Sequence, residues 1–71
     1  MEELDLHGVR HQDAGRVVEN FLVVNEMPVQ IITGNSTRMQ KIVRDVCERH
    51  GYNADYPHHY NLGALVITDG H

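Results

Sequence analysis

Hydrophobic and polar residues alternate along several short stretches of the chain, and this pattern predicts four β-strands. Leu4 and Leu6 alternate with polar neighbours, which is the period of a half-buried strand. Residues 29–33 are rich in β-branched side chains, and residues 64–68 form a continuous apolar run. Both of these stretches are typical of strands inside a sheet, whereas the alternating residues 52–56 indicate an edge strand.

Between these stretches the apolar period changes to that of an amphipathic helix. Apolar residues recur every three or four positions over residues 14–22 and again over residues 39–47, which predicts one helix in each segment. We expect the first helix to end near Asn25. The second should end near His50 and Gly51, since glycine commonly follows the last turn of a helix.

The start of the second helix has two candidate N-caps, Ser36 and Thr37. Either hydroxyl can accept a hydrogen bond from a free backbone N–H group of the first helical turn. Thr37 and Gln40 have the spacing of a capping box, which favours Thr37. Farther along this helix Cys47 falls in the apolar stripe, so we interpret it as a small core residue and not as a nucleophile.

The predicted element order is βαβαββ, in which the first two strands are parallel and joined through a helix. This order indicates an α/β fold, a two-layer sandwich whose four-stranded mixed sheet carries both helices on one face. The length of 71 residues suits one domain. We therefore expect a single domain over residues 1–71, with its core in residues 4–68.

Composition places the chain among globular proteins, with 41% hydrophobic and 23% charged residues. No apolar run approaches the roughly 18 residues that span a bilayer, so no association with a membrane is expected. The acidic residues 1–3 differ from the start of a secretory signal, and a single cysteine forms no internal disulfide. These features together predict a cytoplasmic protein.

The formal net charge of −4 counts against a protein that binds nucleic acid mainly by electrostatic attraction. Basic residues nevertheless cluster in residues 36–50, where four basic and two acidic residues leave a local charge of +2. This cluster has two interpretations, a local contact with phosphate or an ordinary solvated helix face. Its basic members are Arg38, Lys41, Arg44 and Arg49.

A polar turn over residues 33–37 follows the second predicted strand and leads into the second helix. Such a turn offers free backbone N–H groups and the positive end of a helix dipole to an anion. At the end of the first strand, Asp5 and His7 are expected to project from one strand face, before Gly8. Because the carboxyl ends of parallel strands meet at one edge of a sheet, the two segments together suggest a phosphodiester site.

These two segments carry a resemblance to the Smr (small MutS-related) domain family. Leu4-Asp5-Leu6-His7-Gly8 matches the LDLHG motif that opens the family's domain, and Ile32-Thr33-Gly34 matches the start of its TGxG motif. Gly63 is similar to the last glycine of the third, glycine-rich segment. The resemblance covers residues 4–68. It implies a fold similar to the C-terminal domain of bacterial translation initiation factor three, nucleic-acid binding and, in many members, nicking or RNA endonuclease activity. We expect RNA or branched DNA as the partner.

The chain departs from the family pattern at two places. Ser36 stands where the TGxG motif has its second glycine, and the third segment, residues 60–63, keeps only one glycine. Glycine permits close approach of the backbone to a ligand. The change to Ser36 therefore either weakens phosphate binding or supplies a hydroxyl in its place, and it puts catalysis in doubt more than the fold.

The residues of the suspected site have distinct candidate roles. His7 is the candidate general acid or base, oriented through Asp5, because an imidazole titrates near neutral pH; the alternative is a histidine held only for structure. Asp5 and His7 can also hold Mg²⁺, although two ligands are too few to assign a metal site. The candidate phosphate-binding residues are Gly8, Arg10, Thr33, Gly34, Asn35, Ser36, Thr37, Arg38 and Gly63.

Three functions remain open from the sequence. The first is a nucleic-acid-binding domain with endonuclease activity on phosphodiesters. The second keeps the binding and lacks the cleavage. The third is a small protein–protein interaction module, which the acidic isoelectric point of about 5.8 and a sheet face without an assigned role support.

Overall fold

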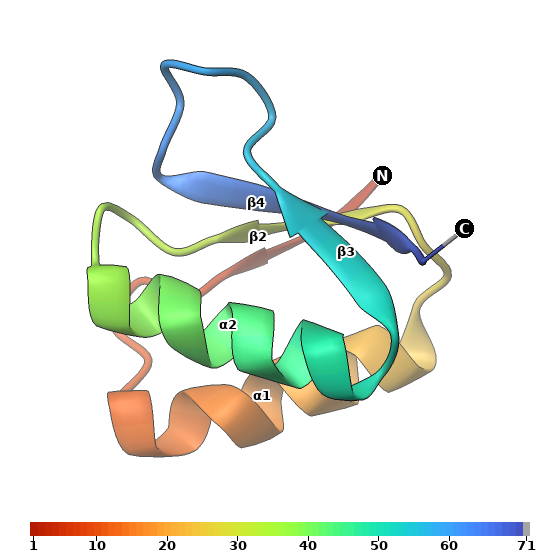
Figure 1. The fold of residues 1–71 in the computed structure, drawn as a ribbon. Coiled ribbons are helices and arrows are strands. Elements are labelled where there is room, and N and C mark those ends of the chain that lie inside the picture. The colour runs from red at the N-terminus through yellow and green to blue at the C-terminus, as the bar shows by residue number, and fades with distance from the viewer. Residues whose placement is uncertain (71) are drawn as a thin grey trace.

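The computed structural model describes residues 1–70, and His71 lies outside the described residues. Its element order is βαβαββ, as predicted (Figure 1). The elements are β1 (Glu2–Asp5), α1 (His11–Val24), β2 (Val29–Ile32), α2 (Thr37–Arg49), β3 (Tyr52–Asp55) and β4 (Ala64–Asp69).

The four strands form one mixed sheet in the order β1-β2-β4-β3. β1 and β2 are parallel, with Leu4 opposite Ile31, and β4 is antiparallel to both β2 and β3. β2 and β4 therefore occupy the interior of the sheet, and β3 lies at an edge, as their hydrophobic patterns predicted. The loop between β2 and α2 and the loop between β3 and β4 consequently leave the sheet at the same end.

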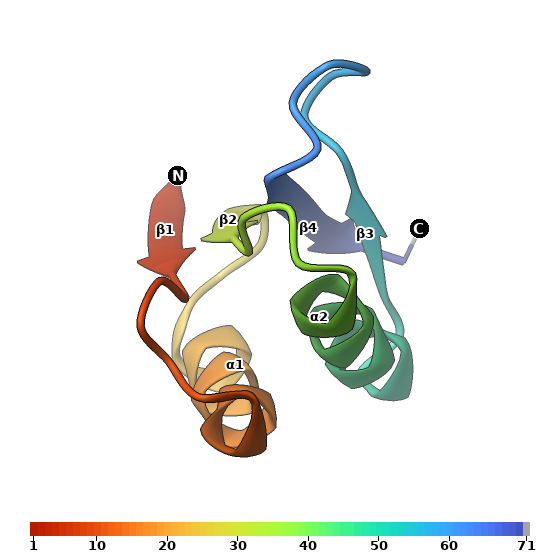
Figure 2. The same cartoon turned by 90° about the vertical axis from the view of Figure 1, so that its left-hand side faces the viewer.

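Both helices pack on one face of the sheet and leave the other face open, which makes the fold a two-layer α/β sandwich (Figure 2). The helices also pack on each other, and a Cβ placed on Gly15 of α1 would lie 4.0 Å from Cγ2 of Ile42 in α2. No helix within residues 1–70 combines the length and the apolar character that crossing a membrane requires. The buried core consists of Leu6, Ala14, Val18, Leu22, Val29, Ile31, Met39, Val43, Val46, Cys47, Leu65 and Ile67.

The two helices end close to their predicted positions. α1 ends at Val24, and α2 is followed by His50 and by Gly51, whose φ of 75° places it in the left-handed region. Such a glycine lets the chain reverse after the last helical turn. The apolar stripe of α2 includes Cys47, which is 1% exposed, so the prediction of a small core residue is confirmed.

The N-cap of α2 is Ser36, and the prediction that favoured Thr37 is wrong. The Ser36 hydroxyl accepts a hydrogen bond from the backbone N–H of Met39 at 3.1 Å, and Thr37 is the first helical residue. The capping box fails because the Gln40 side chain accepts no hydrogen bond from the backbone N–H of Thr37 within residues 1–70. It bonds instead to the carbonyl oxygens of Gly34 and Leu62.

Candidate phosphodiester-binding site

Three segments that the sequence analysis singled out meet at one end of the sheet, shown facing the viewer in Figure 2. β1 and β2 are parallel, so their carboxyl ends coincide, and the Leu6 N–H continues their pairing with a 2.9 Å bond to the Ile32 carbonyl. β4 is antiparallel to β2, so its start lies at the same end. The Gly63 carbonyl accepts hydrogen bonds from the N–H groups of Thr33 and Gly34, both at 2.9 Å.

The first segment is a tight turn after β1, which is shorter than predicted. β1 ends at Asp5, and a hydrogen bond of 3.0 Å from the Val9 N–H to the Leu6 carbonyl closes the turn. Gly8 has a φ of 82°, a value that type II turns require at this position and that glycine adopts without strain. His7 therefore lies in the turn and not on the strand.

The prediction that Asp5 and His7 project from one strand face is wrong, because His7 lies in this turn. The Asp5 carboxylate accepts a hydrogen bond from the backbone N–H of His7 at 2.9 Å, so the contact involves the main chain and not the imidazole. Asp5 thus fixes the turn that presents His7. The His7 side chain is exposed and makes no hydrogen bond within residues 1–70. Arg10, the N-cap of α1, is also exposed and makes no side-chain capping bond.

The second segment is the turn between β2 and α2, which is partly closed by internal hydrogen bonds. Gly34 adopts a φ of 67°. The Thr33 hydroxyl is directed at carbonyl oxygens, 2.8 Å from that of Gly34 and 3.4 Å from that of Gly63. Because the N–H groups of Thr33 and Gly34 also bond to Gly63, these residues shape the turn and offer no free backbone donor to a ligand.

Backbone N–H groups that are free to bind a ligand begin at Asn35, one residue after Gly34. The backbone N–H groups of residues 35–38 find no acceptor within the described part of the chain. The Ser36 hydroxyl accepts from Met39 and keeps its own proton available. Asn35 and Thr37 are exposed beside it. These groups surround the N-terminus of a 13-residue helix, where the helix dipole is positive.

The first turn of α2 lacks an acidic residue, in contrast to the first turn of α1. α1 carries Asp13 there, which also pairs with Arg16 at 3.6 Å. The corresponding turn of α2 contains the exposed Arg38. The positive end of the α2 dipole is therefore reinforced by a cation and is not neutralised by a local carboxylate.

The other basic residues of α2 have intramolecular partners. Lys41 pairs with Asp45 at 3.3 Å, and Arg49 pairs with Glu19 at 3.7 Å. The Arg44 guanidinium donates to the Ala54 carbonyl at 2.6 Å. Within residues 1–70, Arg38 is left as the cation of the predicted basic cluster without such a partner.

Gln40 and Tyr56 connect this site to the loop between β3 and β4, a role that the sequence pattern does not indicate. Gln40 Nε2 donates to the carbonyl oxygens of Gly34 at 3.1 Å and Leu62 at 2.6 Å. The Tyr56 hydroxyl donates to Gln40 Oε1 at 2.9 Å, and the Arg44 guanidinium lies 5.3 Å from the centre of the Tyr56 ring. Since these contacts span up to 22 residues of chain, no local pattern marks them.

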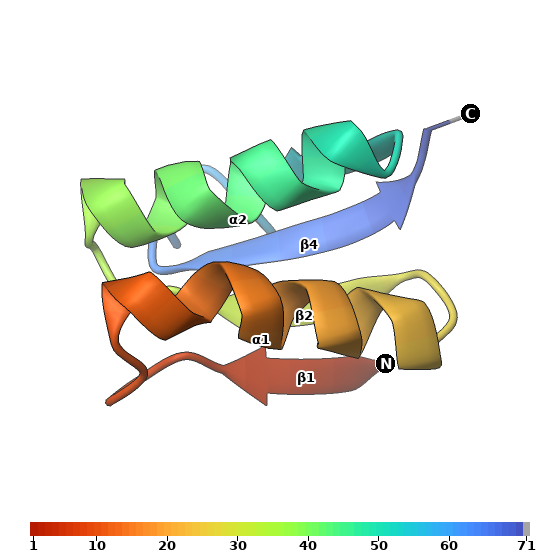
Figure 3. The ribbon, with the colours of Figure 1, turned by 90° about the horizontal axis from the view of Figure 1, so that it is seen from below.

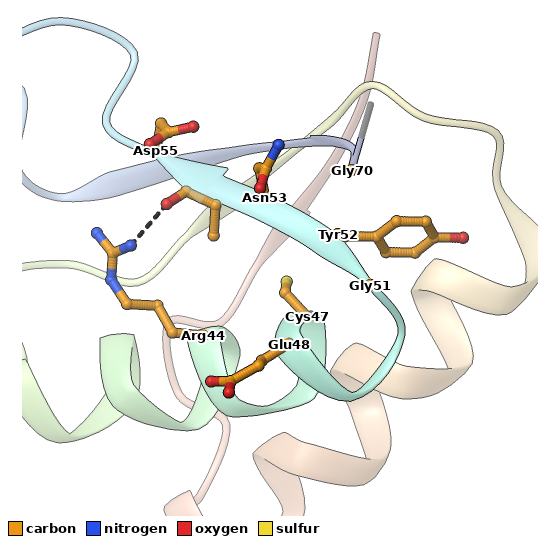
Figure 4. A pocket seen from close by; sticks show the side chains of 9 residues that line it. Arg44, Cys47, Glu48, Gly51, Tyr52, Asn53, Asp55 and Gly70 are labelled. Carbon is orange, nitrogen blue, oxygen red and sulfur yellow. Dashed lines mark hydrogen bonds between the residues drawn. The ribbon is translucent and has the colours of Figure 1, made fainter.

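An open cleft of about 480 Å³ lies elsewhere, between the second half of α2 and β3 (Figure 4). Arg44 crosses it to reach the backbone of β3, and Cys47 forms part of its inner wall. Burial raises the pKa of the Cys47 thiol to about 11, against a smaller opposing effect of Arg44. The thiol therefore stays protonated at neutral pH. None of the predicted site residues lines this cleft.

Within residues 1–70 no three His, Cys, Asp or Glu side chains gather closely enough to hold a metal ion. A role for Mg²⁺ beside Asp5 and His7 stays a prediction. It would require water or phosphate oxygens to complete the coordination.

The chain was compared with protein-family models, curated proteins and solved structures, and no match was found in any of the three comparisons. The resemblance to Smr domains consequently rests on the motifs and on their positions, and it stays a prediction.

Proposed function

We propose that this protein is a nucleic-acid-binding domain of the Smr type that binds a phosphodiester at the N-terminus of α2 and cleaves it with the help of His7. The observation that carries the proposal is the meeting of the LDLHG turn with the free N–H groups of residues 35–38 at one end of the sheet. Gly63 holds the second turn in place from the third segment.

Phosphate binding at this place uses hydrogen bonds more than net charge. The N–H groups of residues 35–38 and the Ser36 hydroxyl are donors to phosphate oxygens, and Arg38 adds a charge-assisted contact. Arg10 lies at the N-terminus of α1, which begins at the same end of the molecule (Figure 3). If these two cations each neutralise one phosphate of a single strand, the slope of log affinity against log salt is about −1.4.

His7 supplies the chemistry in this proposal. In RNA it removes the proton of the 2′-hydroxyl, whose oxygen attacks the adjacent phosphorus while the bond to the 5′-oxygen breaks. A 2′,3′-cyclic phosphate forms, and the leaving 5′-oxygen takes a proton from water. DNA has no 2′-hydroxyl, so cleavage there needs an activated water or a metal ion such as Mg²⁺. Donors that already point at the phosphate stabilise the negative charge that develops on its oxygens.

A cleavage assay tests the proposal. Labelled single-stranded RNA, duplex RNA and branched DNA are incubated with the wild type and with His7→Ala, in Mg²⁺ and in chelator. His50→Gln is the matched control, because His50 is a histidine at the C-terminal end of α2, whereas the candidate site lies at the N-terminal end. Cleavage that only His7→Ala loses supports the endonuclease. Binding without cleavage by the wild type leaves an inactive nucleic-acid-binding domain.

The open face of the sheet favours a protein partner as the second candidate function. Ile32 and Val66 are half-buried on neighbouring strands there, and the exposed Asp5 and Asp55 lie beside them in the strand register. An aliphatic centre with an acidic border suits a basic, partly apolar protein surface. Absence of nucleic-acid binding even at low salt would favour this function.

A further inference from the structure

The loop between β3 and β4 presents aromatic rings beside the candidate phosphate site. We propose that this loop stacks on an unpaired base of the bound strand, so that the site selects single-stranded over duplex nucleic acid. This inference rests on the function proposed above, because it assigns a substrate class to the same site. Its central residue is Tyr60.

Tyr60 is 77% exposed and contacts the rings of two other exposed residues, His58 and His59. Its ring centre is 4.5 Å from that of His58, at an interplanar angle of 56°, and 4.6 Å from that of His59, at 82°. An isolated antiparallel β-bridge between His58 and Asn61 closes this part of the loop. The cluster packs on itself and stays outside the core, so its ring surface remains available to a ligand.

Hydrogen bonds connect the loop that carries the aromatic cluster (His58, His59 and Tyr60) to the phosphate site. Gln40, in the first turns of α2, holds the Leu62 carbonyl at 2.6 Å, and Gly63 accepts the N–H groups of Thr33 and Gly34. Tyr60 precedes Leu62 by two residues, so their Cα atoms are at most about 7 Å apart. The loop rises from the sheet beside the β2–α2 turn (Figure 2). A base on Tyr60 and a phosphate at α2 can therefore belong to neighbouring nucleotides.

The region around the phosphate site and the loop between β3 and β4 is poor in acidic residues, although the protein as a whole is acidic. The chain has ten acidic residues, and none of them falls in residues 27–44 or 56–68. These two segments supply the β2–α2 turn, the first half of α2 and the aromatic loop. The acidic residues that border these segments along the chain are Glu26, Asp45, Asp55 and Asp69. An exposed tyrosine can also bind a protein, but a surface that excludes carboxylates next to Arg38 fits an anionic chain better.

Stacking on Tyr60 requires a base whose face is free. In a duplex the neighbouring base pairs cover both faces, whereas a single strand can turn a base outward onto an aromatic side chain. Such stacking contributes about 1–3 kcal/mol per base. Loss of the ring should therefore weaken binding of a single strand by about 5- to 150-fold.

The test compares three ligands of equal length by fluorescence anisotropy: a single-stranded oligouridylate, its duplex with oligoadenylate, and an abasic strand that keeps the phosphates and lacks the bases. Wild type should bind oligouridylate at least about 5-fold more tightly than the other two. Tyr60→Ala should abolish this difference. Tyr60→Phe should preserve it, because the Tyr60 hydroxyl makes no hydrogen bond within residues 1–70. Arg38→Ala should weaken all three ligands by a similar factor.

The outcomes separate this inference from the proposed function. Equal binding of oligouridylate and the abasic strand by wild type would overturn the stacking and leave the phosphate site standing. An unchanged preference in Tyr60→Ala would do the same. No binding of any of the ligands at low salt would overturn both proposals. Thermal unfolding of each variant verifies the fold, which the exposed Tyr60 is not expected to affect.

Discussion

The side-chain amide of Gln40 donates a hydrogen bond of 2.6 Å to the main-chain carbonyl of Leu62, which lies 22 residues later in the chain. The same nitrogen lies 3.1 Å from the Gly34 carbonyl. One side chain therefore fixes the distance between the turn that begins α2 and the loop that leads into β4. The phosphate site and the aromatic loop are positioned by a residue that belongs to neither.

Gln40→Ala should lower the free energy of unfolding by about 1–2 kcal/mol, because it leaves two carbonyls without this donor and frees the Tyr56 hydroxyl. Urea denaturation measures this change. Gln12→Ala is the matched control, since Gln12 is an exposed glutamine of α1 without a side-chain hydrogen bond within residues 1–70. Equal effects of the two substitutions would show that the Gln40 contacts contribute nothing to stability.

Ser36→Ala should destabilise the protein by about 0.5–2 kcal/mol, because it removes the hydrogen bond that caps the Met39 N–H. Thr37→Ala should have an effect of less than about 0.5 kcal/mol, because Thr37 is exposed and lies inside the helix. Thermal or urea unfolding of both variants compares them. A larger cost for Thr37→Ala would mean that the cap is at residue 37.

Gly34→Ala should cost about 1–2 kcal/mol of folding stability, since Gly34 has a φ of 67° that an alanine adopts with strain. Gly63→Ala is a close comparison. A Cβ there would meet its nearest neighbours, Asn35 Oδ1 and Gly34, at 3.7 Å, which is ordinary contact. We expect little loss of stability for Gly63→Ala, and the opposite order of the two effects would contradict the observed backbone.

The stability of the protein should fall at alkaline pH because of Cys47. Burial raises the pKa of this thiol from 9.0 to about 11 in the folded state, so the unfolded chain loses the proton first. The associated stability is present below pH 9, and about 2 kcal/mol of it is lost by pH 11. Urea denaturation at pH 8 and pH 11 should show a larger decrease for the wild type than for Cys47→Ala. An equal decrease would mean that the thiol does not contribute.

The sequence predicted the elements well because their hydrophobic periods reflect burial on one face. The apolar stripes of α1 and α2 face the core, and so do Ile31 of β2 and Leu65 of β4 within their apolar runs. The weaker pattern of β3 matches its place at the edge. The end of β1 was misplaced because Leu6 stays buried after the strand has ended. Alternation therefore continues to Leu6 although the main chain turns there.

The candidate site was predicted in its location and only partly in its details. The parallel pairing of β1 and β2 follows from the βαβ order, so the two turns could be placed together. Which donors are free depends on contacts with Gly63, and these became visible only in three dimensions. Likewise, the Gln40 side chain bonds to residues of two separate loops, which the spacing of a capping box cannot reveal.

The central claim is that a phosphodiester binds at the N-terminus of α2, and an NMR titration tests it most directly. The protein, labelled with ¹⁵N, is titrated at low salt with a short single-stranded RNA. Saturable shifts of the backbone amides of residues 35–38, with smaller shifts at His7 and Gly8, are the predicted result, and Arg38→Ala should reduce the affinity. Shifts confined to the open face of the sheet, or none at all, would contradict the claim.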